Sequence, residues 1–351
     1  MTVAYMDSGY LRNHDRTRLK HLGTFFRISF ILLVGNFAIS CNNKPDTRFL
    51  LGCERISKAP LVSIRFIVGK PFLVSSRRCQ TGKYEIAFKP RTTEERRLTL
   101  PDAVRDLPAN AKITVLIQGY RTSESGSLSS YSVVLNKARA SSYPDILIAY
   151  DWPSIARLSG ELRDEESTVW QGIENVFNLQ NGISAQLRDA IRGYLSDQIM
   201  AEKYGMVSFL QFLSDLRAFT PVTKINIICF SMGCFLLQKA LETGDAQSIS
   251  NLNRLVFLAA DIDRTAFQRV LIRLRDYQRV GVFFSRNDRV VTFASRLANL
   301  GARLGAKGPI ETSDQRLRVF DFTEILGKGD VHSKYLDENY PVIQETLNFL
   351  D

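Results

Sequence analysis

The sequence predicts an α/β protein with a mainly parallel central sheet flanked by helices. Apolar residues make up 45% of the 351 residues and charged residues 23%, which is typical of a globular protein with a substantial core. Short, β-branched apolar runs alternate with segments of helical period, an order that favours a parallel sheet covered on both faces. One strand–helix junction, over residues 225–241, has a Ser at its apex. These three observations define the fold class.

The first 41 residues predict an export signal. Residues 1–27 are polar and carry five Arg or Lys between residues 12 and 27, residues 28–40 are apolar, and small residues precede Cys41. The apolar run is short for a membrane span, which needs about 20 residues. Ala38-Ile39-Ser40-Cys41 resembles the lipobox of bacterial lipoproteins. That resemblance implies a lipidated Cys41 and an exported, membrane-anchored protein of the bacterial cell envelope; a cleaved, secreted or periplasmic protein and an uncleaved anchor are the alternatives.

The basic excess of the chain lies in its N-terminal third. Residues 1–110 hold 19 Lys and Arg against 9 Asp and Glu, whereas residues 111–351 hold 27 of each, for a net charge of +10. A nucleic-acid-binding protein needs a basic face on its working domain, so we expect no nucleic-acid partner. Contact of the N-terminal third with an anionic membrane surface fits the charge. Residues 42–60 are polar and predict a linker, followed by one domain over residues 61–351.

The elements of this domain follow from the hydrophobic pattern. Partial alternation over residues 62–68 and 84–90 predicts strands with one exposed face, which assigns residues 61–110 to the sheet edge. Further strands are predicted over residues 112–118, 145–150, 225–230, 254–260, 280–285 and 316–322. Helices are predicted around residues 128–140, 205–218, 232–243, 264–276, 288–304 and 338–350. Residues 153–204 exceed a normal crossover, and a lid insertion and an ordinary helical excursion are both open.

The junction over residues 225–241 predicts a nucleophile elbow. An apolar strand runs into Ser231, small residues Cys229 and Gly233 lie two positions to either side, and a helical pattern follows directly. The Gly-x-Ser-x-Gly form of this turn exposes a Ser at the edge of a parallel sheet. A Ser that caps an ordinary helix is the alternative. Cys229 and Cys234 are interpreted as small buried residues.

Residues after the later strands supply a base and an acid. Ligands of open α/β sheets collect at the carboxyl ends of the strands. His332 follows the last strand and is the only His beyond the leader. A Ser nucleophile needs such a base, which in turn needs an orienting carboxylate. Asp288 is the first choice; Asp261 and Asp263 are the alternatives, and Asp263 also suits a helix N-cap.

The chain order Ser, acid, His is that of an α/β-hydrolase fold. Acyl transfer on this fold needs preorganised donors for the oxyanion. The N–H of Met232, directly after the nucleophile, is one predicted donor, and Tyr120, in the turn after an earlier strand, is the other. No metal or cofactor is implied, because no His and Cys cluster has ligand spacing. In an oxidising compartment Cys53 and Cys79 are candidates for a disulfide that sequence alone does not establish.

From about residue 111 to residue 350, the chain resembles the α/β-hydrolases of domain of unknown function 900. Six motifs carry the resemblance: residues 118–120 (Gln-Gly-Tyr), 152–154 (Trp-Pro-Ser), 229–233 (Cys-Phe-Ser-Met-Gly), 260–263 (Ala-Asp-Ile-Asp), 285–288 (Ser-Arg-Asn-Asp) and 331–333 (Val-His-Ser). The resemblance implies a triad of Ser231, Asp288 and His332, the residues that the strand-end argument also selects.

Three positions depart from the family pattern: Gln118 and Phe230 replace His, and Val331 replaces Gly. They bear on rate and substrate more than on reaction class. We therefore expect a serine hydrolase, esterase- or lipase-like, that cleaves a small-molecule carboxylic ester or thioester through an acyl-enzyme. The alternatives are a catalytically silent, envelope-anchored binding or scaffold protein, and a peptidase or acyltransferase with the same triad.

Overall fold

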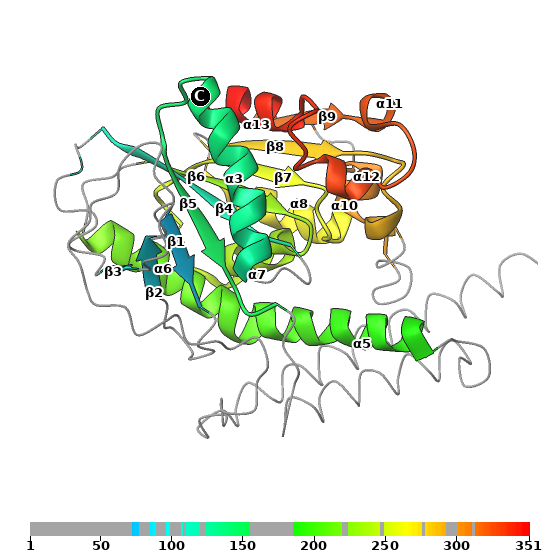
Figure 1. Ribbon diagram of the computed structural model, residues 1–351, viewed down its shortest axis with the longest axis horizontal. Coiled ribbons are helices and arrows are strands. Elements are labelled where there is room, and N and C mark those ends of the chain that lie inside the picture. Colours follow the sequence, from blue (N-terminus) through cyan, green and yellow to red (C-terminus); the bar gives the residue numbers. More distant parts are fainter. Residues whose placement is uncertain are drawn as a thin grey trace, which may run out of the picture. The chain divides into compact units, whose positions relative to one another are not determined.

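A nine-stranded sheet forms the centre of the computed structural model (Figure 1), with the strand order β3-β2-β1-β5-β4-β6-β7-β8-β9. The strands are β1 Phe72–Ser75, β2 Glu85–Phe88, β3 Arg96–Leu98, β4 Lys112–Ile117, β5 Ile146–Asp151, β6 Lys224–Phe230, β7 Leu252–Leu258, β8 Arg279–Phe284 and β9 Leu317–Asp321. Strand β1 and strands β4 to β9 pair in parallel, and β2 and β3 add an antiparallel edge. The predicted fold class is confirmed.

The structure describes part of the chain. The described residues are 72–76, 85–88, 96–98, 107, 110–119, 124–154, 185–219, 224–245, 249–275, 278–292, 301–310 and 313–351, all within the unit Thr47–Asp351. The predicted leader with Cys41, the linker over residues 42–60, and Cys53 and Cys79 lie outside them. None of the helices in the described part is both long and apolar enough to cross a membrane.

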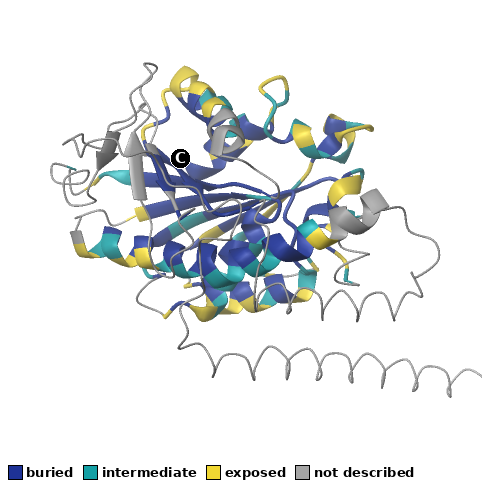
Figure 2. Ribbon diagram, turned by 60° about the horizontal axis from the view of Figure 1, so that its bottom comes forward, coloured by how far each residue is buried: buried dark blue, intermediate teal, exposed yellow. Residues whose placement is uncertain are grey.

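Helices cover both faces of the sheet (Figure 2). Their bounds are α3 Glu124–Ala140, α5 Ala185–Met200, the π-helical turn η3 Ala201–Gly205, α6 Met206–Phe219, α7 Gly233–Thr243, α8 Arg264–Arg273, α10 Leu304–Lys307, α11 Thr323–Leu326, α12 Val331–Lys334 and α13 Val342–Leu350. Helices α5 to α8 share one apolar cluster with the strands, and α3 and α13 share the other. Strands buried on both faces favour apolar residues on both faces, which explains the long apolar runs of the inner strands. Buried polar residues such as Thr114 in β4 and Asn226 in β6 interrupt these runs.

The strands from β4 to β9 match their predicted ranges to within two residues, and β2 lies inside the predicted residues 84–90. The predicted strand over residues 62–68 lies outside the described chain. Strands β1 and β3 were not predicted, because β1 is short and β3 contains two Arg. The helix predicted over residues 288–304 is wrong at its end: Arg303 is extended and bridges Asp263, so α10 begins only at Leu304.

The described part of the stretch over residues 153–204 is a core element. Helix α5 continues through η3 into α6, and Tyr194, Ala201 and Tyr204 along it are buried. The π-helical turn packs closely on the sheet: the Tyr150 hydroxyl donates to the Gly205 carbonyl (2.8 Å). Residues 194–204 are therefore part of the packed core. Residues 155–184 lie outside the described chain, where a lid stays a prediction.

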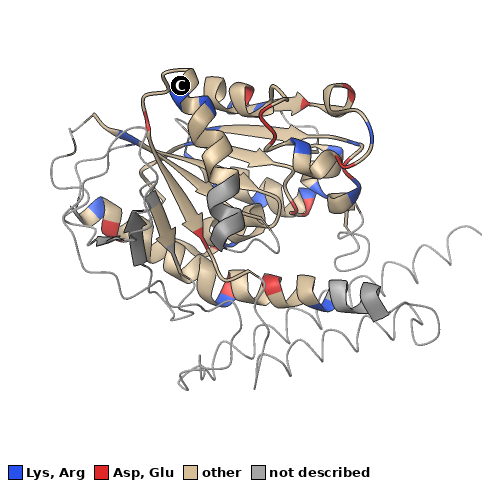
Figure 3. Cartoon of the chain, viewed as in Figure 1, with Lys and Arg blue, Asp and Glu red and all other residues tan. Residues whose placement is uncertain are grey.

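Acidic and basic residues are interspersed along the described helices and strands (Figure 3). This pattern follows from the equal numbers of acidic and basic residues after residue 110.

Candidate active site

The turn between β6 and α7 holds Ser231 in a left-handed backbone conformation. Its φ is 53°, in a region that most residues avoid. The Ser231 N–H donates to the Leu258 carbonyl (3.0 Å). The Ser231 carbonyl accepts from the N–H groups of Cys234 (3.0 Å) and Asp261 (3.1 Å). Bonds from both β7 and α7 thus hold a backbone conformation that would otherwise be unfavourable.

Gly233 is required because α7 begins directly against the end of β4. A Cβ at this position would lie 2.3 Å from the carbonyl oxygen of Gln118 and 2.7 Å from that of Ile117, and only Gly permits so close a backbone approach. The same approach brings Gly119 beside the nucleophile: a Cβ there would lie 3.0 Å from the Ser231 Cβ. The second small position of the predicted elbow therefore has a packing reason.

Three side chains from three separate segments of the chain meet at this turn. The Ser231 hydroxyl lies 3.0 Å from Nε2 of His332, and Nδ1 of His332 lies 2.8 Å from Oδ2 of Asp288. In a neutral imidazole this network assigns the proton to Nδ1, which donates to the carboxylate, and leaves Nε2 to accept from the hydroxyl. The predicted nucleophile is therefore within hydrogen-bonding distance of the predicted base, and the base is within hydrogen-bonding distance of the first-choice acid.

The Asp288 carboxylate is buried and held on both oxygens. Its side chain has no exposed surface, whereas the His332 side chain is 15% exposed. Oδ1 accepts from the Val291 N–H (3.1 Å), which leaves Oδ2 to His332. The neighbouring Asn287 donates to the Gly327 carbonyl (2.6 Å) and so ties the acid loop to the segment that leads to His332. This arrangement fixes the carboxylate and keeps the imidazole accessible.

Asp261, one of the alternative acids, has other partners. Its carboxylate accepts a 2.6 Å hydrogen bond from the Tyr194 hydroxyl and lies 3.1 Å from Nε of Arg303, with both charged side chains 4% exposed. The Arg303 contact is an ion pair without hydrogen-bond geometry. Burial, and then the Asp261 charge, raise the pKa of Tyr194, so its hydroxyl remains a donor. Asp261 thus links the end of β7 to α5.

Asp263, the other alternative acid, is the N-cap of α8. Its carboxylate accepts from the N–H groups of Thr265 (2.8 Å) and Ala266 (3.4 Å) and from the Thr265 hydroxyl. Burial acts to raise the pKa of Asp263, but these hydrogen bonds outweigh it and lower the pKa below its ordinary value of 3.8. In the structure Asp263 therefore caps α8, as the sequence analysis suggested for this residue.

One of the two predicted oxyanion donors lies in the described chain. Met232 is the N-cap of α7, and its N–H donates to no carbonyl of the residues that the structure describes. A free N–H at a helix N-terminus favours negative charge. Tyr120, the other predicted donor, lies outside the described residues, which end at Gly119 in this segment. Trp152 supports that turn, because its Nε1 donates to the Gln118 carbonyl (2.8 Å).

The elbow contains a disulfide that the sequence interpretation missed. Cys229 and Cys234 are bonded, with their Cα atoms 4.8 Å apart, and both are fully buried. Their predicted burial is confirmed, but the bond between them was not predicted. The left-handed turn at Ser231 brings its flanking residues to disulfide distance. Two cysteines around an elbow, in a chain with a predicted export signal, were the available sign.

Aromatic side chains surround the imidazole. The Phe230 ring lies 4.9 Å from the His332 ring and 6.5 Å from the Tyr335 ring, between centroids. The Tyr335 hydroxyl is buried and has no hydrogen-bond partner among the described residues. Its pKa is raised by burial first and by the Asp288 charge second. Phe230, noted in the sequence only as a departure, therefore packs directly against the proposed base.

A hydroxyl, an imidazole, a carboxylate and a free amide are the groups gathered here, and they suit nucleophilic acyl transfer. Within the described part of the chain, no group of three or more His, Cys, Asp or Glu side chains has a geometry that can hold a metal ion. The fold and these groups define the class as an α/β hydrolase.

The chain belongs to the family of alpha/beta hydrolases of unknown function (DUF900), whose model matches residues 102–348. The match includes all three residues of the hydrogen-bonded chain. No curated protein sequence matches this one.

Solved structures with similarity to this chain are hydrolases and esterases. A predicted CIB-like hydrolase from Thermoplasma acidophilum is 13% identical, with 76% of this chain and 91% of that chain covered and a TM-score of 0.36. A carboxylesterase from Bacillus subtilis is 12% identical over 77% and 88%, with a TM-score of 0.32. An esterase from an Arctic intertidal metagenomic library is 11% identical over 76% and 86%, with a TM-score of 0.37.

Proposed function

We propose that this protein is a serine hydrolase that cleaves a carboxylic ester or thioester of a small molecule through an acyl-enzyme. The observation that carries the proposal is the continuous hydrogen-bonded chain from the Ser231 hydroxyl through His332 to Asp288. A Ser hydroxyl is a weak nucleophile near neutral pH and becomes reactive when an adjacent, oriented base accepts its proton. The left-handed turn presents this hydroxyl beside the free Met232 amide.

In the first half of the reaction, Oγ of Ser231 attacks the acyl carbon while Nε2 of His332 takes the hydroxyl proton. Asp288 stays ionised and stabilises the imidazolium. The oxyanion of the tetrahedral intermediate accepts a hydrogen bond from Met232, and the second predicted donor is the amide of Tyr120. When the bond to the leaving group breaks, the imidazolium gives its proton to the leaving alcohol or thiol.

In the second half, water replaces the alcohol. His332 accepts a proton from the water as its oxygen attacks the acyl carbon, and a second tetrahedral intermediate forms. Its collapse breaks the bond to Oγ, returns the proton to Ser231 and releases the carboxylic acid. The net reaction consumes one ester and one water and needs no further reactant.

Hydrolysis of p-nitrophenyl esters of increasing acyl length by the full-length protein tests this proposal. We expect the wild type to hydrolyse at least one ester with a preferred acyl length. Ser231→Ala should lose about 10⁴-fold or more in kcat. Ser132→Ala, which changes an exposed Ser of α3, is the matched control. No turnover by folded wild type, or an unchanged rate in Ser231→Ala, would instead favour a silent binding protein.

We also propose that the protein is exported and anchored to the cell envelope through a lipid on Cys41. The buried disulfide of the elbow supports export, because disulfides persist in oxidising compartments. Cell fractionation of wild type and Cys41→Ala tests the anchor. The wild type should sediment with membranes, and the variant should be lost from the membrane fraction; an equal distribution of both contradicts lipid anchoring.

A further inference from the structure

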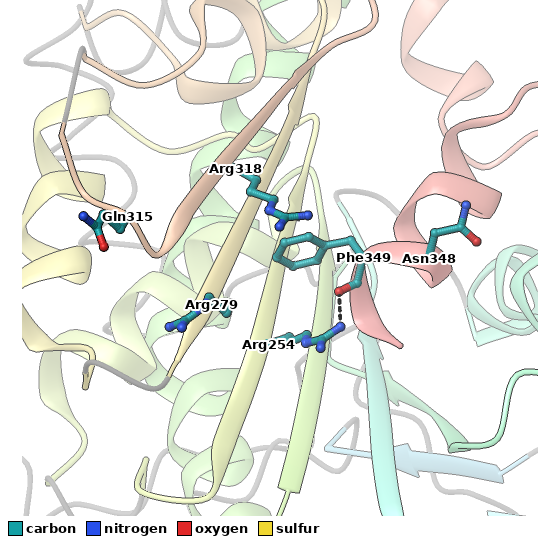
Figure 4. Close-up of a pocket in the computed structure, with 6 residues that line it drawn as sticks. All are labelled: Arg254, Arg279, Gln315, Arg318, Asn348 and Phe349. Atoms are coloured by element: carbon teal, nitrogen blue, oxygen red, sulfur yellow. Dashed lines mark hydrogen bonds between the residues drawn. The ribbon is translucent and has the colours of Figure 1, made fainter.

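Three arginines on neighbouring strands line a pocket remote from Ser231 (Figure 4). They are Arg254 in β7, Arg279 at the start of β8 and Arg318 in β9. The three strands are parallel, and these positions lie near their amino ends. Ser231 follows the carboxyl end of β6, so about 13 Å of strand separates the two ends of the sheet. The pocket is therefore no part of the candidate active site.

The strand register places the three side chains on one face of the sheet. Arg254 pairs with Arg279, and Arg318 pairs with Gly281, which shares a face with Arg279 because side chains alternate along a strand. Helix α13 lies on this face: Nη1 of Arg254 donates to the Phe349 carbonyl (2.6 Å). Gly281 lets two rings pack closely against β8, since a Cβ there would lie 2.9 Å from the Phe283 ring and 3.2 Å from the Phe349 ring.

The pocket has a volume of about 190 Å³ and is lined by hydrogen-bond donors without a carboxylate. Gln315 and Asn348 add side-chain amides to the three guanidinium groups, and Phe349 supplies an apolar wall. A water molecule takes up about 30 Å³ in the liquid, so the volume accommodates a tetrahedral oxyanion. Arg318 makes no hydrogen bond or ion pair with any described residue. The neighbouring Asp314 pairs with Arg316 (2.6 Å), and its pKa is lowered by the hydrogen bond from Arg316 first and also by the Arg279 charge. Arg279 itself donates to the Gln278 carbonyl (3.3 Å).

Like charges on facing strand positions destabilise a sheet. Protection of an edge strand accounts for a charge on β9, and so for Arg318. It does not account for Arg254 and Arg279, because β7 and β8 are inner strands. The planar guanidinium groups match the oxygens of phosphate groups in two-point contacts, so a bound anion of this kind would remove the repulsion.

We propose that this pocket binds a phosphate-class oxyanion, either free or as the phosphate group of a larger molecule such as a lipid. The guanidinium groups of Arg279 and Arg318 supply the charge, and Arg254, held by the Phe349 carbonyl, forms the inner side of the site. The inference is independent of the proposed hydrolysis.

Titration calorimetry of the full-length protein with inorganic phosphate tests the site. We expect one saturable site and an affinity about tenfold or more lower in Arg279→Ala and in Arg318→Ala, since each removes charge-assisted hydrogen bonds. Arg269→Ala on α8 is the control of equal charge, because Arg269 is 59% exposed and pairs with Glu242, away from the pocket lining. Hydrolysis of p-nitrophenyl esters should stay at the wild-type rate in Arg318→Ala.

A second arm separates the two sources of phosphate. The same proteins are sedimented with vesicles of phosphatidic acid in phosphatidylcholine, and with phosphatidylcholine alone. The site is supported if phosphate binding in the calorimeter, or sedimentation with phosphatidic acid vesicles, is weakened in Arg279→Ala and Arg318→Ala. Weakened phosphate binding identifies free phosphate as the source, and weakened vesicle binding identifies a lipid. Absence of saturable binding in both arms, or an equal loss in Arg269→Ala, overturns the proposal.

Discussion

At the scale of single residues, the contact between Asp288 and His332 decides which imidazole nitrogen carries the proton. In Asp288→Asn the side-chain amide would donate to Nδ1 and move the proton to Nε2, where it blocks acceptance from Ser231. We expect kcat on an ester that the wild type hydrolyses to fall about 10⁴-fold, the size of this tautomer effect in serine proteases. The measurement is steady-state kinetics on variants with unchanged circular dichroism.

Asp263→Asn is the matched control for this prediction. It makes the same chemical change in an alternative acid, and Asn is an equally good N-cap, so α8 and the rate should both be preserved. A large loss of rate in Asp263→Asn, with little loss in Asp288→Asn, would show that Asp288 is not the carboxylate that orients His332 and would contradict our account.

For Tyr335 we predict that removal of the hydroxyl lowers neither the stability of the protein nor its rate of ester hydrolysis. Its hydroxyl is buried without a hydrogen-bond partner among the described residues, and its pKa is raised by burial and by the Asp288 charge. Removing an unsatisfied polar group is neutral or stabilising by about 1 kcal/mol. Tyr335→Phe should therefore unfold in urea at the wild-type midpoint or above it and keep its esterase rate. Destabilisation of about 2 kcal/mol or more would mean that the hydroxyl has a partner.

At the scale of elements, the N-cap of α8 couples stability to pH. Asp263 has a lowered pKa in the folded protein, so the unfolded chain binds its proton more tightly. Its stabilising contribution is full above the ordinary pKa of 3.8 and is lost as pH falls through the lower folded pKa. Between pH 6 and pH 3, the urea midpoint of the wild type should fall further than that of Asp263→Asn. Parallel curves for the two proteins would contradict this linkage.

The elbow is the second element with a measurable contribution to stability. The disulfide between Cys229 and Cys234 closes a short loop around Ser231, and closure of about six residues stabilises by roughly 2 kcal/mol in the chain-entropy model. The double variant Cys229→Ala/Cys234→Ala should lose about that amount in the free energy of unfolding. Reductant should lower the stability of the wild type after unfolding and refolding, and leave the variant unchanged. Equal responses to reductant would argue against the bond.

At the scale of the whole molecule, the inner sheet could be predicted because its strands are buried on both faces. Continuous apolar runs mark such strands in the sequence, as in β6 and β8. The edge lacks this sign: β3 consists of Arg96, Arg97 and Leu98 and is a strand only through pairing with β2. Similarly, no local pattern tells that Arg303 extends to bridge Asp263 and so delays α10.

The same division applies to the site. The predicted nucleophile, base and first-choice acid could be found because parallel strands deliver the residues after their carboxyl ends to one edge. The contacts of Tyr194 and Arg303 with Asp261 could not be found, because they join segments far apart in sequence. The sequence already favoured Asp288 over Asp261, and the coordinates add the physical reason: Asp288 contacts His332, whereas Asp261 is engaged by Tyr194 and Arg303.

The central claim is that the hydroxyl of Ser231 is a nucleophile activated by His332. Incubation of the full-length protein with a fluorophosphonate probe, followed by mass spectrometry of its peptides, measures this directly. We predict covalent labelling of Ser231 in the wild type, a greatly slowed reaction in His332→Ala, and unchanged labelling in Ser132→Ala. Folded wild-type protein that stays unlabelled, or that is labelled at another Ser, would contradict the account.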